Sequence, residues 1–263
     1  MEFVANPGSA LGEALGTLLE REIHSFFESF VKERGYIYVT SGLQNTTGDR
    51  TGKLILEDHA GNKYNIDAVI INRRFQPLVL IEAKYIRYKK HNRDKASWIC
   101  TAHTRLRQRY STVRQSIAIL MGNWSRPSRR LLESFDVRLF EIPFEDICSV
   151  LLEFGIDYHW AETDREKAYQ SWTQFSVLSD EQKKLIGERL IAKISDKLKR
   201  ELSSVLDDSR PRRVKSLTIT VQSTHGETRC LHFGDLKSAV EFLSSTPEPQ
   251  LIDVSDAPSL LHE

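Results

Sequence analysis

Two acidic residues and a lysine stand at the ends of strongly apolar segments, where charged side chains are unusual. Asp67 comes directly before the segment 68–71, and Glu82 comes directly after the segment 78–81, with Lys84 two residues further on. An unpaired charge in such a setting is costly, and chains keep one there when it is paired or binds a metal ion. The pattern therefore indicates a site in which carboxylates hold a cation.

The spacing of the two acids predicts that they face each other across a hairpin. A turn at 72–77, folded about its centre, places Asp67 opposite Glu82. Residues directly opposite on antiparallel strands lie roughly 4.5 to 5.5 Å apart at Cβ, and two carboxylates that close repel unless a cation lies between them. Lys84 points to the same side of the sheet as Glu82, because the side-chain period of a strand is two.

Oxygen ligands with no His or Cys nearby suit Mg²⁺ or Mn²⁺ better than zinc. Such an ion polarises a phosphoryl oxygen and lowers the pKa of an attacking water, and a lysine beside that water could orient it or take its proton. Phosphodiester hydrolysis is the reaction that this set of residues suits. An acid-x-Lys spacing alone is weak evidence, since 181–183 and 235–237 also match it, and a structural ion-pair cluster is the alternative interpretation.

An α/β order of elements is expected around this trio. The expected elements are a helix at 11–31, strands at 36–40, 53–57, 63–71 and 78–85, a segment at 96–120 that is helical in its second half, a strand at 137–142 and a helix at 144–154. Further along we expect helices at 164–175 and 179–206, a linker at 207–213, a hairpin of strands 217–222 and 228–233, and a helix at 235–244.

Three regions are expected from this order. Residues 1–155 would form the nuclease core, and residues 156–245 a helical and β-hairpin region for dimerisation or DNA contact. Residues 246–263, rich in Pro, Ser and Asp, would form a flexible tail.

Composition narrows the class of protein. The 263 residues carry a net charge of +1 and three widely spaced cysteines, which suggest neither a disulfide framework nor a zinc site. The N-terminal residues lack the features of a signal peptide, and no run is long enough to cross a bilayer. We expect a cytoplasmic protein with no membrane partner.

The charge is unevenly distributed along the chain. Between Lys84 and Arg138 there are fourteen Lys and Arg against three Asp and Glu. So long and lopsided a segment favours a polyanionic partner over an ordinary solvated surface, which is the alternative.

These motifs resemble those of the PD-(D/E)XK nuclease superfamily, in which an acid on one strand and an acid-x-Lys on the next are flanked by helices. Here the pattern is Ile66-Asp67 followed by Glu82-Ala83-Lys84, with Ile66 in place of the family's proline. The resemblance covers roughly residues 10–142. It implies an α/β fold with a restriction-endonuclease-like core, in which helices flank a central mixed β-sheet. The elements expected after residue 155 add a C-terminal helical and β-hairpin extension to this core.

The resemblance also implies roles for individual residues. Mg²⁺, for which Mn²⁺ could substitute, would be held by Asp67, Glu82 and the backbone carbonyl of Ala83, with Lys84 at the nucleophilic water. Many members add a glutamate from the first helix, and Glu20 is preferred to Glu22 for this role.

Contacts to DNA would come from the basic segment that follows, where phosphate contacts set the register without reading sequence. The residues expected to make them are Arg87, Lys89, Lys90, Arg93, Lys95, Arg105, Arg107 and Arg109, with Gln115 in the following helix, ahead of Arg114. Bases could be reached by His91, Asn92, Trp98, His103 and the loop 46–50.

The function that follows is a Mg²⁺-dependent endonuclease hydrolysing the phosphodiester bonds of double-stranded DNA. A homodimeric type II restriction-type enzyme is the preferred subclass, because two strands require two active sites or two passes. A repair, recombination or transposon-associated structure-specific nuclease of the same fold is one alternative. A catalytically inert nuclease-like module that only binds DNA or a partner protein is another.

Overall fold

The chain divides between Leu206 and Asp207 in the computed structural model, which describes residues 6–40, 54–88, 92–253 and 255. The first unit is Met1–Leu206 and the second is Asp207–Glu263. The division lies there rather than after residue 155, because the helices that follow residue 155 bury their apolar faces in the core of the first unit.

The first unit contains both helices and strands. Its helices are α1 (Pro7–Lys32), α2 (Asn92–Arg109), α3 (Arg126–Ser134), α4 (Phe144–Leu152), α5 (Arg165–Ser176) and α6 (Asp180–Val205). Its strands are β1 (Ile37–Val39), β2 (Leu54–Glu57), β3 (Lys63–Ile66), β4 (Ala68–Ile71), β5 (Pro77–Ile86), β6 (Gln115–Gly122) and β7 (Val137–Pro143).

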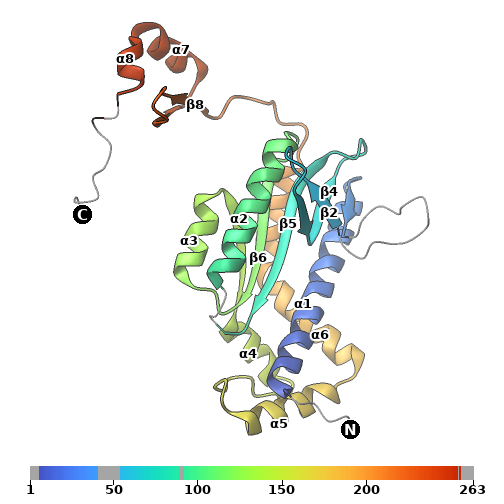
Figure 1. Cartoon of the computed structure of the whole chain (residues 1–263). Helices are drawn as coiled ribbons and strands as arrows, with labels where there is room; N and C mark the ends of the chain where they lie inside the picture. The colour runs from blue at the N-terminus through green and yellow to red at the C-terminus, as the bar shows by residue number, and fades with distance from the viewer. Residues whose placement is uncertain (1–5, 41–53, 89–91, 254, 256–263) are drawn as a thin grey trace. The chain divides into compact units, whose positions relative to one another are not determined.

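Five of these strands form the central sheet, in the order β1-β4-β5-β6-β7, while β2 and β3 form a separate two-stranded ladder. The pairs β1/β4 and β4/β5 are antiparallel, and the pairs β5/β6 and β6/β7 are parallel. The fold is therefore α/β, with a mixed central sheet flanked by helices (Figure 1).

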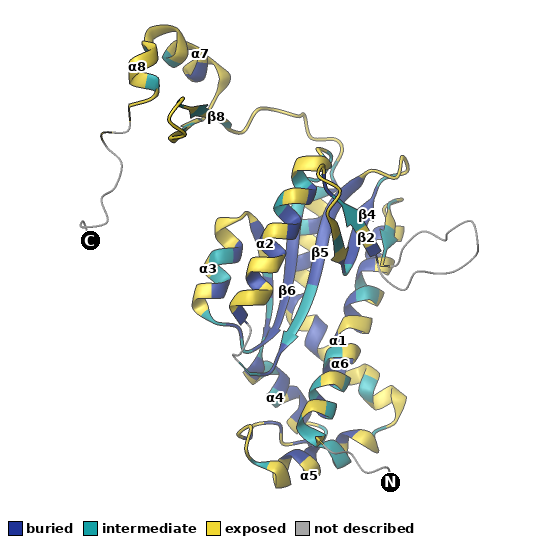
Figure 2. Ribbon diagram, viewed as in Figure 1, coloured by how far each residue is buried: buried dark blue, intermediate teal, exposed yellow. Residues whose placement is uncertain are grey.

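Helices cover both faces of this sheet. On one face α1 packs with α5 and α6, and their apolar residues share a cluster with Val79 and Ile81 of β5. On the other face α2 packs with α3, over Leu80 of β5 and Leu120 of β6. Because both faces are covered, β5 and β6 are apolar over most of their length. Figure 2 shows them mostly buried, with a half-buried stretch in the C-terminal part of β5, at Ala83–Tyr85.

Local sequence signals explain where the long helices α1 and α6 begin and how closely they pack against each other. The side chain of Asn6 caps α1 by accepting the Ser9 N–H, and Pro7 occupies the first turn. A capping box of Ser179 and Gln182 starts α6. At Gly187 an added Cβ would lie 2.3 Å from the Glu22 side chain, so the absence of a side chain there lets α6 pack against α1.

The prediction that the second half of residues 96–120 is helical is wrong. The helix α2 ends at Arg109, and Gln115–Gly122 is the parallel strand β6. A continuous apolar run reads the same in a buried helix and in a strand covered on both faces, and here the β-branched Ile117 and Ile119 belong to the strand. This correction puts strands on both sides of β5 over part of its length.

The second unit contains the predicted hairpin. It consists of β8 (Leu217–Gln222) paired with β9 (Thr228–Phe233), then α7 (Leu236–Ser245) and the short α8 (Glu248–Leu251). Of the expected tail, residues 254 and 256–263 lie outside the described residues. Among the helices that the structure describes in either unit, none is long and apolar enough to cross a membrane.

Candidate active site

Asp67 stands at a bend that separates two strands. The expected single strand at 63–71 is divided there, with β3 pairing β2 and β4 pairing β5. The last pair of the β4/β5 ladder is Ala68↔Ile81, so the next residues along, Asp67 and Glu82, follow the predicted register. Nearer the turn the register shifts, and Pro77 lies opposite Ile71.

The three predicted side chains meet at this point. Lys84 Nζ donates to Asp67 Oδ1 and Oδ2 at 2.9 and 2.7 Å, and the Ala83 N–H donates to Asp67 Oδ2 at 2.8 Å. The same ammonium group lies 2.7 Å from Glu82 Oε2. A cation therefore lies between the two carboxylates, and it is the side chain of Lys84.

Glu82 is the anomalous member of this trio. Its side chain is completely buried, and neither of its oxygens has a partner in hydrogen-bonding geometry, although Lys84 is within ion-pair distance. Burial, and next the charge of Asp67, raise the pKa of Glu82 to about 8, against the opposing effect of Lys84. Burial lowers the pKa of Lys84, but the two carboxylates outweigh burial and raise it overall.

His103 of α2 lies beneath the trio, where the sequence did not indicate it. Its ring is 1 % exposed, both ring nitrogens lack a partner, and Nε2 lies 3.9 Å from Glu82 Oε1. Burial, and next the charge of Arg107, lower its pKa to about 3, so the ring is neutral. Its burial excludes the base contact that we expected of it.

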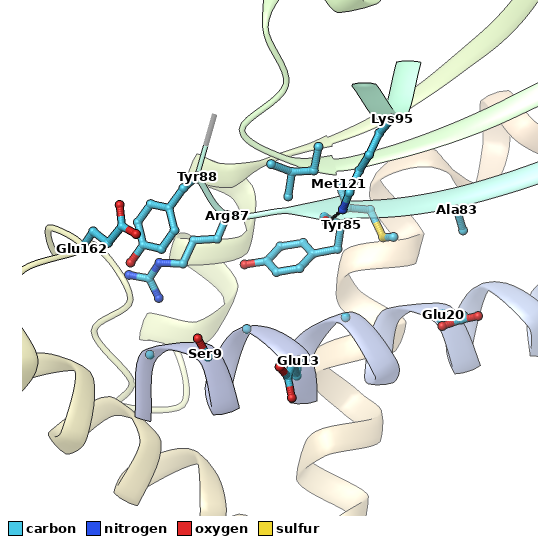
Figure 3. A pocket seen from close by; sticks show the side chains of 14 residues that line it. Ser9, Glu13, Glu20, Ala83, Tyr85, Arg87, Tyr88, Lys95, Met121 and Glu162 are labelled. Carbon is cyan, nitrogen blue, oxygen red and sulfur yellow. Dashed lines mark hydrogen bonds between the residues drawn. The ribbon is translucent and has the colours of Figure 1, made fainter. Parts of the chain in front are cut away.

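A groove of about 510 Å³ opens along the edge of β5, and of residues 82–84 only Ala83 lines it. Pairing with β4 stops at Ile81, so the next residues of β5 pair only with β6 within the described sheet. The groove is bounded by residues of α1, β5 and the start of α2, including Glu20, Ala83, Tyr85 and Lys95 (Figure 3). Burial and the charge of Lys84 lower the pKa of Lys95.

The structure separates the two candidate glutamates of α1. Glu20 lines the groove with Ala83, and its carboxylate lies 3.6 Å from His24 Nε2. Glu22 is buried on the other side of the helix, against Gly187 of α6. The sequence did not indicate His24, whose Nδ1 lies 2.7 Å from the Tyr38 hydroxyl. The i,i+4 spacing of Glu20 and His24 on a helix was the available signal.

Most of the basic residues expected at DNA belong to α2. Arg93, Lys95, Arg105 and Arg109 are exposed and Arg107 is half-buried, while Lys89 and Lys90 lie outside the described residues, as do His91 and the loop 46–50. Arg109 also donates through Nη1 to the backbone carbonyl of Asp58, at 2.7 Å.

Arg87 is not an exposed phosphate contact. Its side chain is buried, its guanidinium lies 3.3 Å from the Trp160 ring centroid and 3.9 Å from that of Tyr158, and Nη2 donates to the backbone carbonyls of both residues. Stacking on aromatic faces stabilises such a buried cation. Arg87 therefore ties the end of β5 to the segment around residues 158–160.

Two further expectations change with the fold. Gln115 begins β6 at the level of Val79, five residues along β5 from Lys84, so the structure does not bring it to the trio. Asn92 is buried and bound to the backbone of Asn123 and Ser125, which excludes a base contact, whereas Trp98 remains partly exposed.

The residues at this site fit a magnesium-type ion in their donor chemistry. Two carboxylates stand together with a cation between them, and the buried oxygens of Glu82 have no hydrogen bond. No group of three or more His, Cys, Asp or Glu that could hold a metal ion occurs among the described residues. Two carboxylates suffice for Mg²⁺, which usually keeps several water ligands and is bound through one or two carboxylates plus substrate phosphates.

Comparisons with known proteins do not assign a family. No protein-family model matches the sequence, and no curated protein matches it. Among solved structures, a chain described as "Crystal Structure of Protein of Unknown Function AF1548" matches at 11% identity, covering 70% of this chain and 99% of that chain, with a TM-score of 0.32. A likeness at that TM-score supports no conclusion about fold or function.

Proposed function

We propose that the protein is a Mg²⁺-dependent DNA endonuclease with a restriction-endonuclease-like core. The observation that carries the proposal is the meeting of Asp67, Glu82 and Lys84 at the point where β4 stops pairing with β5 and the groove begins. Burying Glu82 without a hydrogen bond is costly for folding, and a cation bound there offsets that cost.

The ion would be held by the carboxylates of Asp67 and Glu82 and by the backbone carbonyl of Ala83. The N–H and C=O of one strand residue point toward the same neighbour, and the Ala83 N–H points to Asp67, which supports the carbonyl as a ligand. When bound, Mg²⁺ supplies Lewis-acid polarisation of a phosphoryl oxygen and a lowered pKa for the attacking water. Mn²⁺ is expected to substitute.

Lys84 has the second role in this proposal. Once an ion takes its place between the carboxylates, its ammonium group is free to donate to the attacking water or to a phosphate oxygen. Its side chain is about one quarter exposed, so part of it remains accessible to solvent while the ammonium group contacts the carboxylates. Glu20 lines the groove together with Ala83, and in this proposal it would bind a water of the ion's shell.

DNA is expected to lie over α2 and along the groove. The exposed cations of α2, Arg93, Lys95 and Arg105, lie on the helix that carries His103 beneath the site, and their contacts would position phosphates without reading sequence. We favour a duplex substrate and a homodimer of the type II restriction kind, since two strands need two active sites or two passes.

The experiment that tests the function is digestion of a plasmid with Mg²⁺ or with EDTA, followed by sequencing of the ends. The parent is expected to cut only with Mg²⁺, and the variants Asp67→Asn and Lys84→Met to lose cleavage while still binding DNA in Ca²⁺. Lys183→Met, which alters the acid-x-Lys match at the start of α6, is the matched control and should cut like the parent. Equal cutting by all four proteins would refute the site assignment.

The ends of the products decide the subclass. Discrete fragments with one recurring end sequence support the restriction-type enzyme. Cuts confined to branched or gapped substrates would replace it with a structure-specific nuclease of the same site. DNA binding without cutting under any divalent ion would leave an inert binding module.

A further inference from the structure

Two buried polar side chains face each other under the candidate site without hydrogen bonds. Both oxygens of Glu82 and both ring nitrogens of His103 lack a hydrogen-bond partner, and His103 Nε2 lies 3.9 Å from Glu82 Oε1. Buried polar groups in native proteins are nearly always hydrogen-bonded, and each exception calls for an explanation. Because these two unsatisfied groups lie in contact, one explanation should account for both.

Packing holds the His103 ring against the Glu82 carboxylate. It belongs to α2 between Ala102 and Leu106, whose side chains pack with Leu80 of β5 in an apolar cluster. Solvent does not compete for hydrogen bonds to the ring, because the side chain is only 1 % exposed. A neutral ring has one N–H donor, and the partner within reach of Nε2 is Glu82.

Lys84 contacts the carboxylate of Asp67 and the Glu82 oxygen that does not face His103. Its ammonium hydrogen-bonds to both oxygens of Asp67 and lies near Glu82 Oε2, which leaves Oε1 facing α2 and His103. A shift of under about 1 Å would bring Nε2 and Oε1 to the ordinary N–H···O distance. Such a shift is within the reach of side-chain adjustment when the charge between the carboxylates changes from lysine to a divalent ion.

We propose that His103 is a positioning residue for Glu82: its Nε2–H donates to Oε1 and fixes the carboxylate in the orientation that binds the divalent ion. The inference rests on the proposed function for the identity of the ion, and it predicts a distinct role for one buried side chain of α2. Partners of metal ligands of this kind typically change metal affinity 10- to 100-fold when removed.

The test compares three substitutions of His103 that differ in donor reach. His103→Gln keeps an N–H donor at the ε position, His103→Asn withdraws the donor to the δ position, and His103→Met keeps the volume with no donor. The readout is the Mn²⁺ concentration that half-saturates the thermal shift of the protein, together with the unfolding midpoint in EDTA. Cys100→Ala, on the same helix but packed against the cluster around Leu131, is the matched control.

The Met and Asn variants are expected to need about 10- to 100-fold more Mn²⁺, and the Gln variant to stay within about threefold of the parent. In EDTA the Met variant should unfold at or above the parental temperature, because two unpaired buried nitrogens are removed. Cys100→Ala should unfold earlier at the parental Mn²⁺ requirement. A residue that only packs would give the opposite result, a lower midpoint with an unchanged Mn²⁺ requirement.

Parental Mn²⁺ requirements in the Met and Asn variants would overturn the role of His103, as would equal weakening in all three variants or the absence of any Mn²⁺ shift in the parent. If the Met variant does not fold, the comparison of Gln with Asn decides alone. A Mn²⁺ requirement that rises as expected supports the role of His103 even if the parent cuts no DNA, in which case the nuclease proposal alone fails.

Discussion

Asp58 and Glu82 are both almost completely buried, but the groups around them differ sharply in the hydrogen bonds that they offer. Asp58, in the turn between β2 and β3, accepts hydrogen bonds from the N–H groups of Ala60 and Asn62, from the Asn62 amide and from the Tyr64 hydroxyl. These bonds, with the Asn62 amide first, lower its pKa to about 2. Glu82 has no hydrogen bond, and burial raises its pKa to about 8.

The difference separates a structural carboxylate from a candidate functional one. Asp58 stabilises its turn, and both of its carboxylate oxygens accept hydrogen bonds from groups of that turn and of β3. Glu82 is held in an apolar strand with no hydrogen bond and with the Lys84 ammonium as its ion-pair partner. Such an arrangement is costly for folding and is typical of sites that bind a cation or a substrate. The following predictions test that distinction, from the largest expected effect to the smallest.

Replacing the two acids by their amides should separate activity from stability most clearly. Glu82→Gln is expected to lower Mg²⁺-dependent DNA cleavage by roughly a thousandfold or more, because metal-assisted charge stabilisation is worth several kcal/mol. Asp58→Asn should retain cleavage at temperatures where it is folded and should unfold earlier, since the amide presents an N–H to the donors of the turn. Measuring the cleavage rates and thermal midpoints of the two variants side by side tests both expectations: lost cleavage in Glu82→Gln and lost stability in Asp58→Asn.

The pH dependence of stability should differ in sign between the two acids. In the metal-free protein the raised pKa of Glu82 contributes stability that is complete below its ordinary value of 4.5 and is lost as pH rises through about 8. The lowered pKa of Asp58 contributes stability that is present above 3.8 and is lost as pH falls through about 2.

Urea unfolding of the metal-free protein between pH 5 and 9 measures the Glu82 part. The parent should lose about 2–4 kcal/mol relative to Glu82→Gln over this range. Parallel curves for the two proteins would mean that Glu82 is not protonated by burial, and the comparison with Asp58 would then lose its basis.

A third carboxylate, Glu20, tests whether position at the groove matters more than burial. Glu20→Gln is expected to lower cleavage about tenfold, or about 1.4 kcal/mol in transition-state stabilisation, by weakening the hold on a water of the ion's shell. Glu22→Gln, two residues along α1 but packed against α6, is the control and should keep the parental rate. Initial rates at saturating Mg²⁺ distinguish the two; equal losses would show that α1 acts through packing alone.

The smallest effect is expected at Gln115. It lies at the level of Val79 at the start of β6, away from Lys84, so Gln115→Ala should change the cleavage rate by less than about twofold. A loss as large as that of Glu20→Gln would place Gln115 in the site after all and would contradict the strand register on which the account depends.

The sequence predicted the trio because its signals are local. Asp67 and Glu82 each adjoin an apolar strand, and a short turn between the strands fixes their register, so the meeting of the carboxylates follows from spacing alone. The hairpin of the second unit was predicted for the same reason, with turn residues between two alternating segments.

The remaining features depend on long-range packing, which leaves a weaker trace in the sequence. The run at 115–122 has the apolar composition of a buried helix, and only its place beside β5 makes it a strand. Arg87 looks like one of a row of surface cations, yet the aromatic residues at 158 and 160, far along the chain, enclose it. His103 likewise becomes informative only once α2 is laid over Glu82.

The measurement that tests the central claim most directly is calorimetric titration of the protein with Mn²⁺. The claim is that Asp67 and Glu82 form a divalent-cation site whose place Lys84 takes when no ion is bound. The account predicts saturable Mn²⁺ binding by the parent, competed by Mg²⁺, that is lost in the double variant Asp67→Asn/Glu82→Gln and kept in Asp58→Asn. Equal Mn²⁺ binding by the parent and the double variant would contradict it.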